Sequence, residues 1–236
     1  MDIGNLKALN AARRARRAAI LLTDLAEGRE RVIAPGDPVE EGVTAAIEDA
    51  FRSGKSRLVE ADGRRFFLNV HLPPPRLMVI GAVHVSQALA PMAKIAGYDM
   101  EIIDPRTAFA TGERFPDVRL HAEWPEDVLK AQPLDAFTAL AALTHDPKID
   151  DYPLREAVLA GCFYVGALGS RRTHAARVER LKASGLSDEQ IGRIHAPIGL
   201  DIGAASPAEI AVAVLGQVIS ALRKRDLKTG VGSGRA

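Results

Sequence analysis

The chain has 236 residues, of which 47% are hydrophobic and 26% charged, and this ordinary globular composition excludes long disordered or fibrous segments. It contains no run of about 18 apolar residues, which excludes a membrane-spanning helix. The basic start of the sequence also lacks the apolar run and cleavage site of a signal peptide. The single cysteine, Cys162, excludes an internal disulfide and a cysteine-cluster metal site. We therefore expect a cytoplasmic protein.

The net charge of +1, from 31 basic and 30 acidic residues, is unevenly distributed. Residues 1–20 contain five basic residues and one acidic residue, residues 223–236 contain the same numbers, and the sequence between them therefore carries a charge of −7. A nucleic-acid-binding domain would carry its positive charge on the folded body, so we do not expect a nucleic-acid partner.

Residues 1–72 are expected to form a small α+β domain. The predicted elements are a helix over residues 5–18, short strands over 19–22 and 31–33, a helix over 39–52, and strands over 58–59 and 66–70. Apolar residues at helical spacing and a stop at Gly54 indicate the second helix. The Asp62-Gly63 pair between the last two strands is typical of a β-hairpin.

Residues 73–225 are expected to form a second domain, which begins at the stiff Pro73-Pro74-Pro75 run. Buried strands are predicted over 77–80, 100–103, 137–143 and 163–165. Helices are predicted up to about residue 96, from Arg171 and up to about Arg225, with capping boxes at 187–190 and 206–209 and a kink at Pro91. This alternation predicts a Rossmann-like, doubly wound parallel sheet. Residues 226–236 are expected to be a flexible basic tail.

In such sheets, ligands bind at the carboxyl ends of the strands. The turn after the first strand has candidate binding residues Gly81, Ala82 and His84, but Val83 and Ser86 replace two glycines of the dinucleotide fingerprint, which argues against NAD(P). After the second strand, Asp104 could bond a ribose hydroxyl and Arg106 a phosphate. The alternative is that Asp104 only caps local backbone.

Three later segments complete the candidate site. Thr144, His145 and Asp146 follow the third strand and could orient a heterocycle, move a proton or contact a metal, although a structural loop histidine is the alternative. No second histidine or cysteine is nearby, so we expect no metal bound by protein ligands alone. The segment over residues 166–174 lies at a helix N-terminus and is suited to an anion. Its candidate residues are Gly166, Gly169, Ser170, Arg171, Arg172 and Thr173. The segment over residues 195–204 is a glycine-containing loop with candidate residues Asp201 and Gly203.

Several of these segments together resemble one family. They resemble the XdhC/CoxI family of accessory proteins for molybdenum hydroxylases. The segments that carry the resemblance are residues 73–85, 104–106, 113–116, 143–146, 166–174 and 194–209. The resemblance spans residues 73–222. It implies a Rossmann-like domain in a cytoplasmic chaperone, rather than an enzyme, that binds molybdenum cofactor as molybdopterin or its dinucleotide form. It further implies a hydroxylase apoenzyme of the xanthine dehydrogenase, aldehyde oxidoreductase or CO dehydrogenase type as partner, with a cysteine desulfurase and a homodimer as further options.

On this hypothesis, Gly169 to Thr173 would hold the anion, Asp104 and Arg106 the sugar or phosphate side, and Thr144 to Asp146 the pterin or the oxygen ligands of the metal. Pro38 stands where the family has an N-terminal cysteine, and we expect Cys162 to be buried and inert.

Two other hypotheses are an NAD(P)-dependent oxidoreductase and a non-catalytic assembly module that docks a partner through its basic ends.

Overall fold

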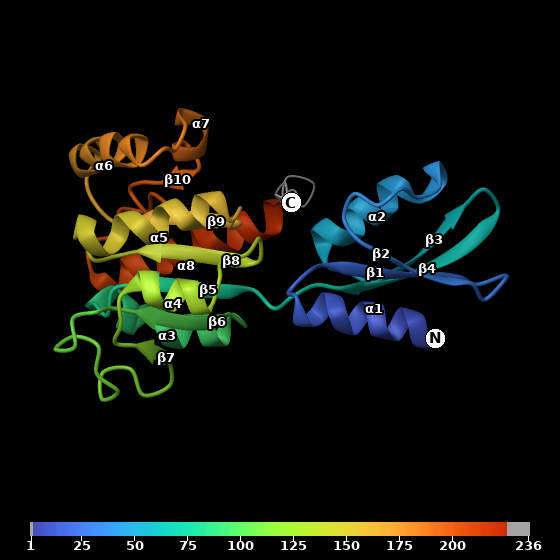
Figure 1. Cartoon of the computed structure of the whole chain (residues 1–236), viewed down its shortest axis with the longest axis horizontal. Helices are drawn as coiled ribbons and strands as arrows, with labels where there is room; N and C mark the ends of the chain where they lie inside the picture. The colour runs from blue at the N-terminus through green and yellow to red at the C-terminus, as the bar shows by residue number, and fades with distance from the viewer. Residues whose placement is uncertain (1, 226–236) are drawn as a thin grey trace. The chain divides into compact units, whose positions relative to one another are not determined.

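The computed structural model describes residues 2–225, which divide into two compact units (Figure 1). One contains the chain up to Pro73 and the described residues from Arg223, and the other contains Pro74–Leu222. The division falls within the proline run. The predicted basic tail, residues 226–236, lies outside the described residues.

The N-terminal unit is an antiparallel sheet with strand order β2-β1-β4-β3 and two helices. Its elements are α1 (Ile3–Arg14), β1 (Ala19–Asp24), β2 (Glu30–Ile33), α2 (Glu41–Ser53), β3 (Arg57–Ala61) and β4 (Arg64–His71). Helix α2 buries Val43, Ile47 and Phe51, and it ends at Gly54, whose left-handed φ of 70° suits glycine. Strands β3 and β4 form the hairpin that Asp62-Gly63 predicts.

The second unit is a six-stranded sheet in which every neighbouring pair is parallel. Its elements are β5 (Arg76–Ile80), α3 (His84–Ile95), β6 (Asp99–Ile103), β7 (Arg119–His121), α4 (Pro125–Ala131), β8 (Thr138–Ala142), α5 (Pro147–Leu159), β9 (Tyr164–Ala167), α6 (Arg171–Ala183), α7 (Asp188–Ile191), β10 (Ile194–His195) and α8 (Pro207–Lys224). The order β10-β9-β8-β5-β6-β7 is that of the Rossmann fold. The predicted fold class, a doubly wound parallel sheet preceded by a small α+β part, is therefore confirmed.

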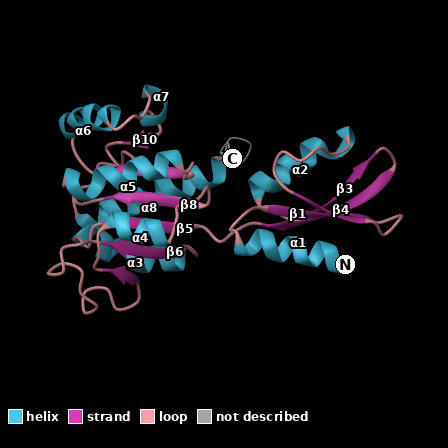
Figure 2. Cartoon of the chain, in the orientation of Figure 1, coloured by secondary structure: helices cyan, strands magenta, loops and turns pink. Residues whose placement is uncertain are grey.

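Helices cover both faces of this sheet (Figure 2). Alternate residues of β5 point to opposite faces, so that Leu77 packs in the cluster that includes Leu89 of α3 and Val218 of α8. Met78 packs in the opposite cluster, with Leu154 of α5. Because both faces are buried, the strand needs a continuous apolar run rather than an alternating one.

Local signals at helix ends account for several boundaries. The Ser187 side chain caps α7 in a reciprocal capping box with Gln190, as predicted. Helix α3 continues through Pro91, which is exposed. No sequence pattern predicts β7, α4, α5 or β10. Helix α5 has Pro153 in its interior, where proline is typical of a helix end. Across residues 2–225, no helix has the length and apolar character that a membrane crossing needs.

Candidate functional site

The strand order of the Rossmann unit reverses between β5 and β8, so the loops after these strands border the crevice where such folds bind ligands. Gly81, just after β5, is buried and has a φ of 116°. A Cβ added at Gly81 would lie 2.9 Å from Cγ2 of Thr144, just after β8. Glycine is needed here because it supplies the backbone conformation and lets the two loops approach closely.

The turn between β5 and α3 is closed by side chains of the protein itself. Ser86 stands where the dinucleotide fingerprint has its third glycine, and its hydroxyl donates to the Gly81 carbonyl at 2.5 Å. The guanidinium of Arg114 donates to the Ala82 carbonyl at 3.0 Å and to Oε1 of Gln87 at 2.9 Å. Ala82 is buried and His84 is exposed at the start of α3. Arg114 therefore places a cation beside this turn, a role that the sequence analysis missed because Arg114 lies in a loop without a strand-end signal.

Asp104, at the end of β6, is fully buried and holds Arg106 in place. Oδ1 of Asp104 accepts from the N–H and the Nε of Arg106, each at 2.9 Å, and Oδ2 accepts from the Ala82 N–H and Nη2 of Arg106, each at 2.8 Å. Burial raises the pKa of Asp104, but these hydrogen bonds outweigh it and leave the pKa below its usual value. Because both oxygens already accept two hydrogen bonds, Asp104 positions Arg106 and is not free to bond a ribose.

The loop after β8 is organised by a buried carboxylate that the sequence analysis missed. Asp150, 1% exposed, accepts from the Thr144 hydroxyl at 2.7 Å and from the His145 N–H at 3.0 Å. Asp146 caps α5 through the Lys148 N–H at 2.9 Å. Thr144 and Asp146 therefore make structural bonds, whereas His145 is left exposed with a left-handed φ of 63°. Burial raises the pKa of Asp150 to about 6.

The loop between β9 and α6 meets the loop after β8. A Cβ added at Gly169 would lie 3.7 Å from Nδ1 of His145, so Gly169 and His145 are neighbours. Ser170 caps α6 by accepting from the Thr173 N–H at 3.2 Å. Gly166 has a packing role, because an added Cβ would lie 2.7 Å from Cγ1 of Ile198. The next two residues on α6, Arg171 and Arg172, are exposed, and within residues 2–225 their side chains make no hydrogen bond or ion pair.

A third arginine of α6 lies beneath these loops. The side chain of Arg177 is buried, with the residue 2% exposed, and its Nη2 donates to the Leu168 carbonyl at 3.0 Å. Its Nε and Nη1 are buried and have no hydrogen-bond partner among the described residues. Burial lowers the pKa of Arg177, and its charge acts on Asp150 and His145. Unpaired buried donors cost about 1–3 kcal/mol each, so such a group calls for an explanation.

The loop after β10 places the last two candidates, Asp201 and Gly203, on the surface. Its close backbone approach occurs at Gly199 instead, where an added Cβ would lie 3.1 Å from Cβ of Ala213. The Gly199 N–H and the Tyr164 hydroxyl both donate to Oε1 of Gln217, at 2.8 and 2.7 Å. The structure therefore shows what anchors this loop, whereas Asp201 has no side-chain partner within residues 2–225.

The residues that could hold a metal directly are sparse. Cys162 is 1% exposed, and burial raises the pKa of its thiol to about 12, so it is a neutral thiol and a poor metal ligand. Within the described part of the chain, histidine, cysteine and carboxylate side chains do not gather in threes around a point where a metal ion could sit.

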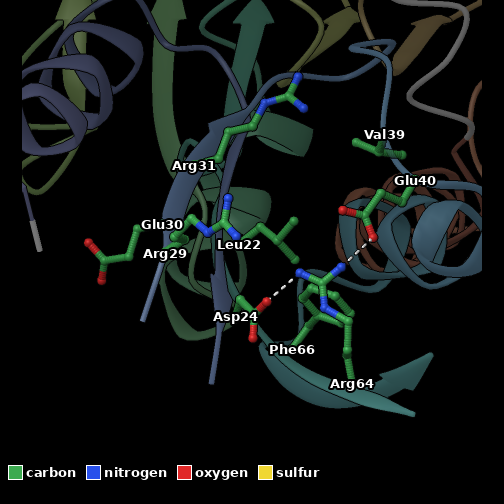
Figure 3. Close-up of a pocket in the computed structure, with 9 residues that line it drawn as sticks. All are labelled: Leu22, Asp24, Arg29, Glu30, Arg31, Val39, Glu40, Arg64 and Phe66. Atoms are coloured by element: carbon green, nitrogen blue, oxygen red, sulfur yellow. Dashed lines mark hydrogen bonds and ion pairs between the residues drawn. The ribbon is translucent and has the colours of Figure 1, made fainter. Parts of the chain in front are cut away.

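The N-terminal unit has a separate pocket of about 240 Å³ (Figure 3). Arg64 lies in it and forms ion pairs with Asp24 and Glu40. A second lining arginine, Arg31, donates to the Pro38 carbonyl at 3.0 Å. Both of these arginines therefore have partners within the protein.

Comparisons with known proteins place the Rossmann unit in a family. A model described as the XdhC Rossmann domain matches residues 77–218, more than half of the chain. Escherichia coli K12 has two relatives that are each 34% identical: the protein YqeB over 157 residues and the molybdenum cofactor insertion chaperone PaoD over 148 residues. The matches cover 65% and 63% of this chain, and 28% and 40% of the relatives.

A third relative, from Bacillus subtilis 168, is named as a probable xanthine dehydrogenase subunit. It is 32% identical over 154 residues, which are 65% of this chain and 44% of that protein. The matches thus span less than half the length of these three relatives. A crystal structure described as a xanthine dehydrogenase from Bacillus halodurans has a TM-score of 0.64 at 20% identity and covers 98% of this chain and 68% of that one. At that identity the likeness concerns the fold alone.

Proposed function

This chain belongs to the XdhC family, and on that premise we propose that it is an accessory chaperone that binds molybdenum cofactor in its Rossmann unit and delivers it to a molybdenum hydroxylase. Its relative PaoD is named a molybdenum cofactor insertion chaperone, which supports this role. The hydroxylase, and a cysteine desulfurase as a second partner, are predictions that follow from the family.

The observation that carries the proposal is the set of cationic and donor groups along one edge of the sheet. Arg106 follows β6, His145 follows β8, and Arg171, Arg172 and Arg177 lie on the helix after β9. Strands β6, β5, β8 and β9 are neighbours in the sheet, so this edge spans three strand intervals, or about 14 Å. It has the length and charge to bind an elongated ligand that bears phosphate.

These residues fit the organic part of the cofactor better than its metal. Arginine N–H groups match phosphate oxygens, and the unpaired donors of Arg177 are such groups. When bound, the cofactor supplies the molybdenum together with the sulfur ligands that hold it. The chain's own residues would bind phosphate and orient the pterin, and the neutral, buried Cys162 favours binding and delivery over sulfur chemistry.

The alternative of an NAD(P)-dependent oxidoreductase fits the site less well. Both oxygens of Asp104 are engaged by Ala82 and Arg106, which leaves no acceptor for the ribose diol. Val83 replaces the glycine that would let the backbone approach a pyrophosphate.

The second alternative is an assembly module without ligand binding. It differs in one outcome, because replacing Arg171 and Arg172 by alanine would then leave activation of the partner unchanged.

The test is anaerobic binding of the purified chain to molybdenum cofactor, in molybdopterin and dinucleotide forms, with NAD(P) as the control. We expect one form of the cofactor to bind and to be transferred to a hydroxylase apoenzyme, with weaker transfer after Arg171→Ala and Arg172→Ala. Tight binding of NAD(P) without binding of either cofactor form would overturn the proposal.

A further inference from the structure

The guanidinium of Arg177 is buried, although its Nε and Nη1 have no hydrogen-bond partner within residues 2–225. We propose that Arg177 is an oxyanion-binding residue that takes a phosphate or diphosphate group of the ligand between the loops after β8 and β9. The inference rests on the proposed function for the identity of the natural ligand, but not for the chemistry of the site.

The position of Arg177 on α6 directs its side chain toward the start of the helix. Side chains on a helix tilt toward its N-terminus, and Arg177, within α6, reaches back to the carbonyl of Leu168, three residues before the helix begins at Arg171. The positive charge of Arg177 therefore lies toward the N-terminal end of α6, and both the charge and the helix end attract an anion.

In the part of the chain that the structure describes, no carboxylate forms an ion pair with Arg177. Asp150 influences it electrostatically, but the Asp150 oxygens accept from the Thr144 hydroxyl and the His145 N–H. Arg180, on the same helix, shows the contrasting arrangement, with Nε and Nη2 both bonded to the carboxylate of Asp151. Arg177 alone of this pair keeps two nitrogens, Nε and Nη1, without a hydrogen-bond partner in the described chain.

The chemistry of those nitrogens selects the ligand. Guanidinium N–H groups only donate, so they need an acceptor, and burial favours an acceptor that carries negative charge. Phosphate oxygens meet both conditions. Both nitrogens are shielded from solvent, so on this proposal an oxyanion reaches them between the loops after β8 and β9, which meet at His145 and Gly169.

The first experiment titrates the full-length chain with inorganic pyrophosphate and, in a parallel arm, with inorganic phosphate, using calorimetry. A stronger response to pyrophosphate indicates a diphosphate ligand, and a stronger response to phosphate indicates a monoester. We expect Arg177→Met to weaken binding by about 10- to 100-fold, which corresponds to the loss of charge-assisted hydrogen bonds, and Arg177→Lys to weaken it less. The matched control, Arg180→Met, should stay within about twofold, since Arg180 is paired elsewhere.

A second measurement needs no variant that could fail to fold. In wild-type protein labelled with ¹⁵N-arginine, a slowly exchanging Nε–H resonance should move on addition of pyrophosphate, because Nε of Arg177 is buried. If pyrophosphate shifts no protected Nε–H resonance, or if Arg171→Gln with Arg172→Gln abolishes binding while Arg177→Met does not weaken it, the inference is wrong.

The same variants separate this inference from the proposed function. If the wild type binds molybdenum cofactor and Arg177→Met binds it equally well, Arg177 has no such role although the function stands. If no cofactor form binds but pyrophosphate binding depends on Arg177, the oxyanion site stands and the proposed function fails.

Discussion

Asp150 provides a test of the site's electrostatics through stability. Burial raises its pKa from 3.8 to about 6, and the Thr144 hydrogen bond and the charge of Arg177 offset only part of that effect. A carboxyl whose pKa is higher in the folded state contributes stability that is fully present below pH 3.8 and is lost as the pH rises through about 6. Two pKa units correspond to about 3 kcal/mol.

The measurement compares urea unfolding of the wild type with that of Asp150→Asn at several pH values. Asparagine does not titrate, so the difference between the two free energies of unfolding isolates the contribution of Asp150 from those of other carboxyls. From about pH 4 to about pH 7, the variant should gain about 2 kcal/mol relative to the wild type, because part of the full effect has already been lost at pH 4. A constant offset between the two, whatever its size, accompanied by an Asp150 carboxyl ¹³C titration near pH 4, would refute the reasoning.

Three further substitutions test the architecture of the site and its scaffold. Gly81→Ala should destabilise by about 1–3 kcal/mol, because φ is 116° and the new Cβ would lie 2.9 Å from Thr144 Cγ2; an unchanged melting temperature would contradict the close approach of the two loops. Asp104→Asn should cost about 2–3 kcal/mol and weaken cofactor binding, because it removes a charged acceptor from Arg106; urea unfolding with a binding titration checks both effects, and wild-type values in both would count against the positioning role. Ser187→Ala should cost about 1 kcal/mol through the lost cap of α7 while leaving cofactor binding intact, and a loss of binding without a loss of stability would be inconsistent with this.

The elements that were predicted well are those with strong local signals. The buried strand over 77–80 and helix α2 follow from apolar runs and from spacing, and Gly54 ends α2 as its conformational freedom allows. Helix α5 was missed because Pro153 breaks the expected pattern, although the helix forms around it in the tertiary structure. Strand β10 has two residues, too few for a pattern.

In the candidate site too, features with a local sequence signal could be predicted, and contacts between distant residues could not. Strand ends and a glycine loop are local, so the sequence could place Asp104, His145 and Gly169 at the carboxyl edge of the sheet. It could not distinguish Asp104 as a ribose ligand from Asp104 as the group that positions Arg106, because that depends on which donors surround the carboxylate in space.

The sequence by itself determined the Rossmann-like fold class, through four of its strands, and the resemblance to the XdhC family, because both rest on residue order along the chain. Only the tertiary structure decided that, among the arginines of α6, Arg171 is exposed and Arg177 is buried with unpaired donors. Arginine has the same local chemistry at both positions. Burial and pairing depend on residues outside the helix, here Leu168 in the preceding loop and Asp150 on α5, that folding brings near one guanidinium.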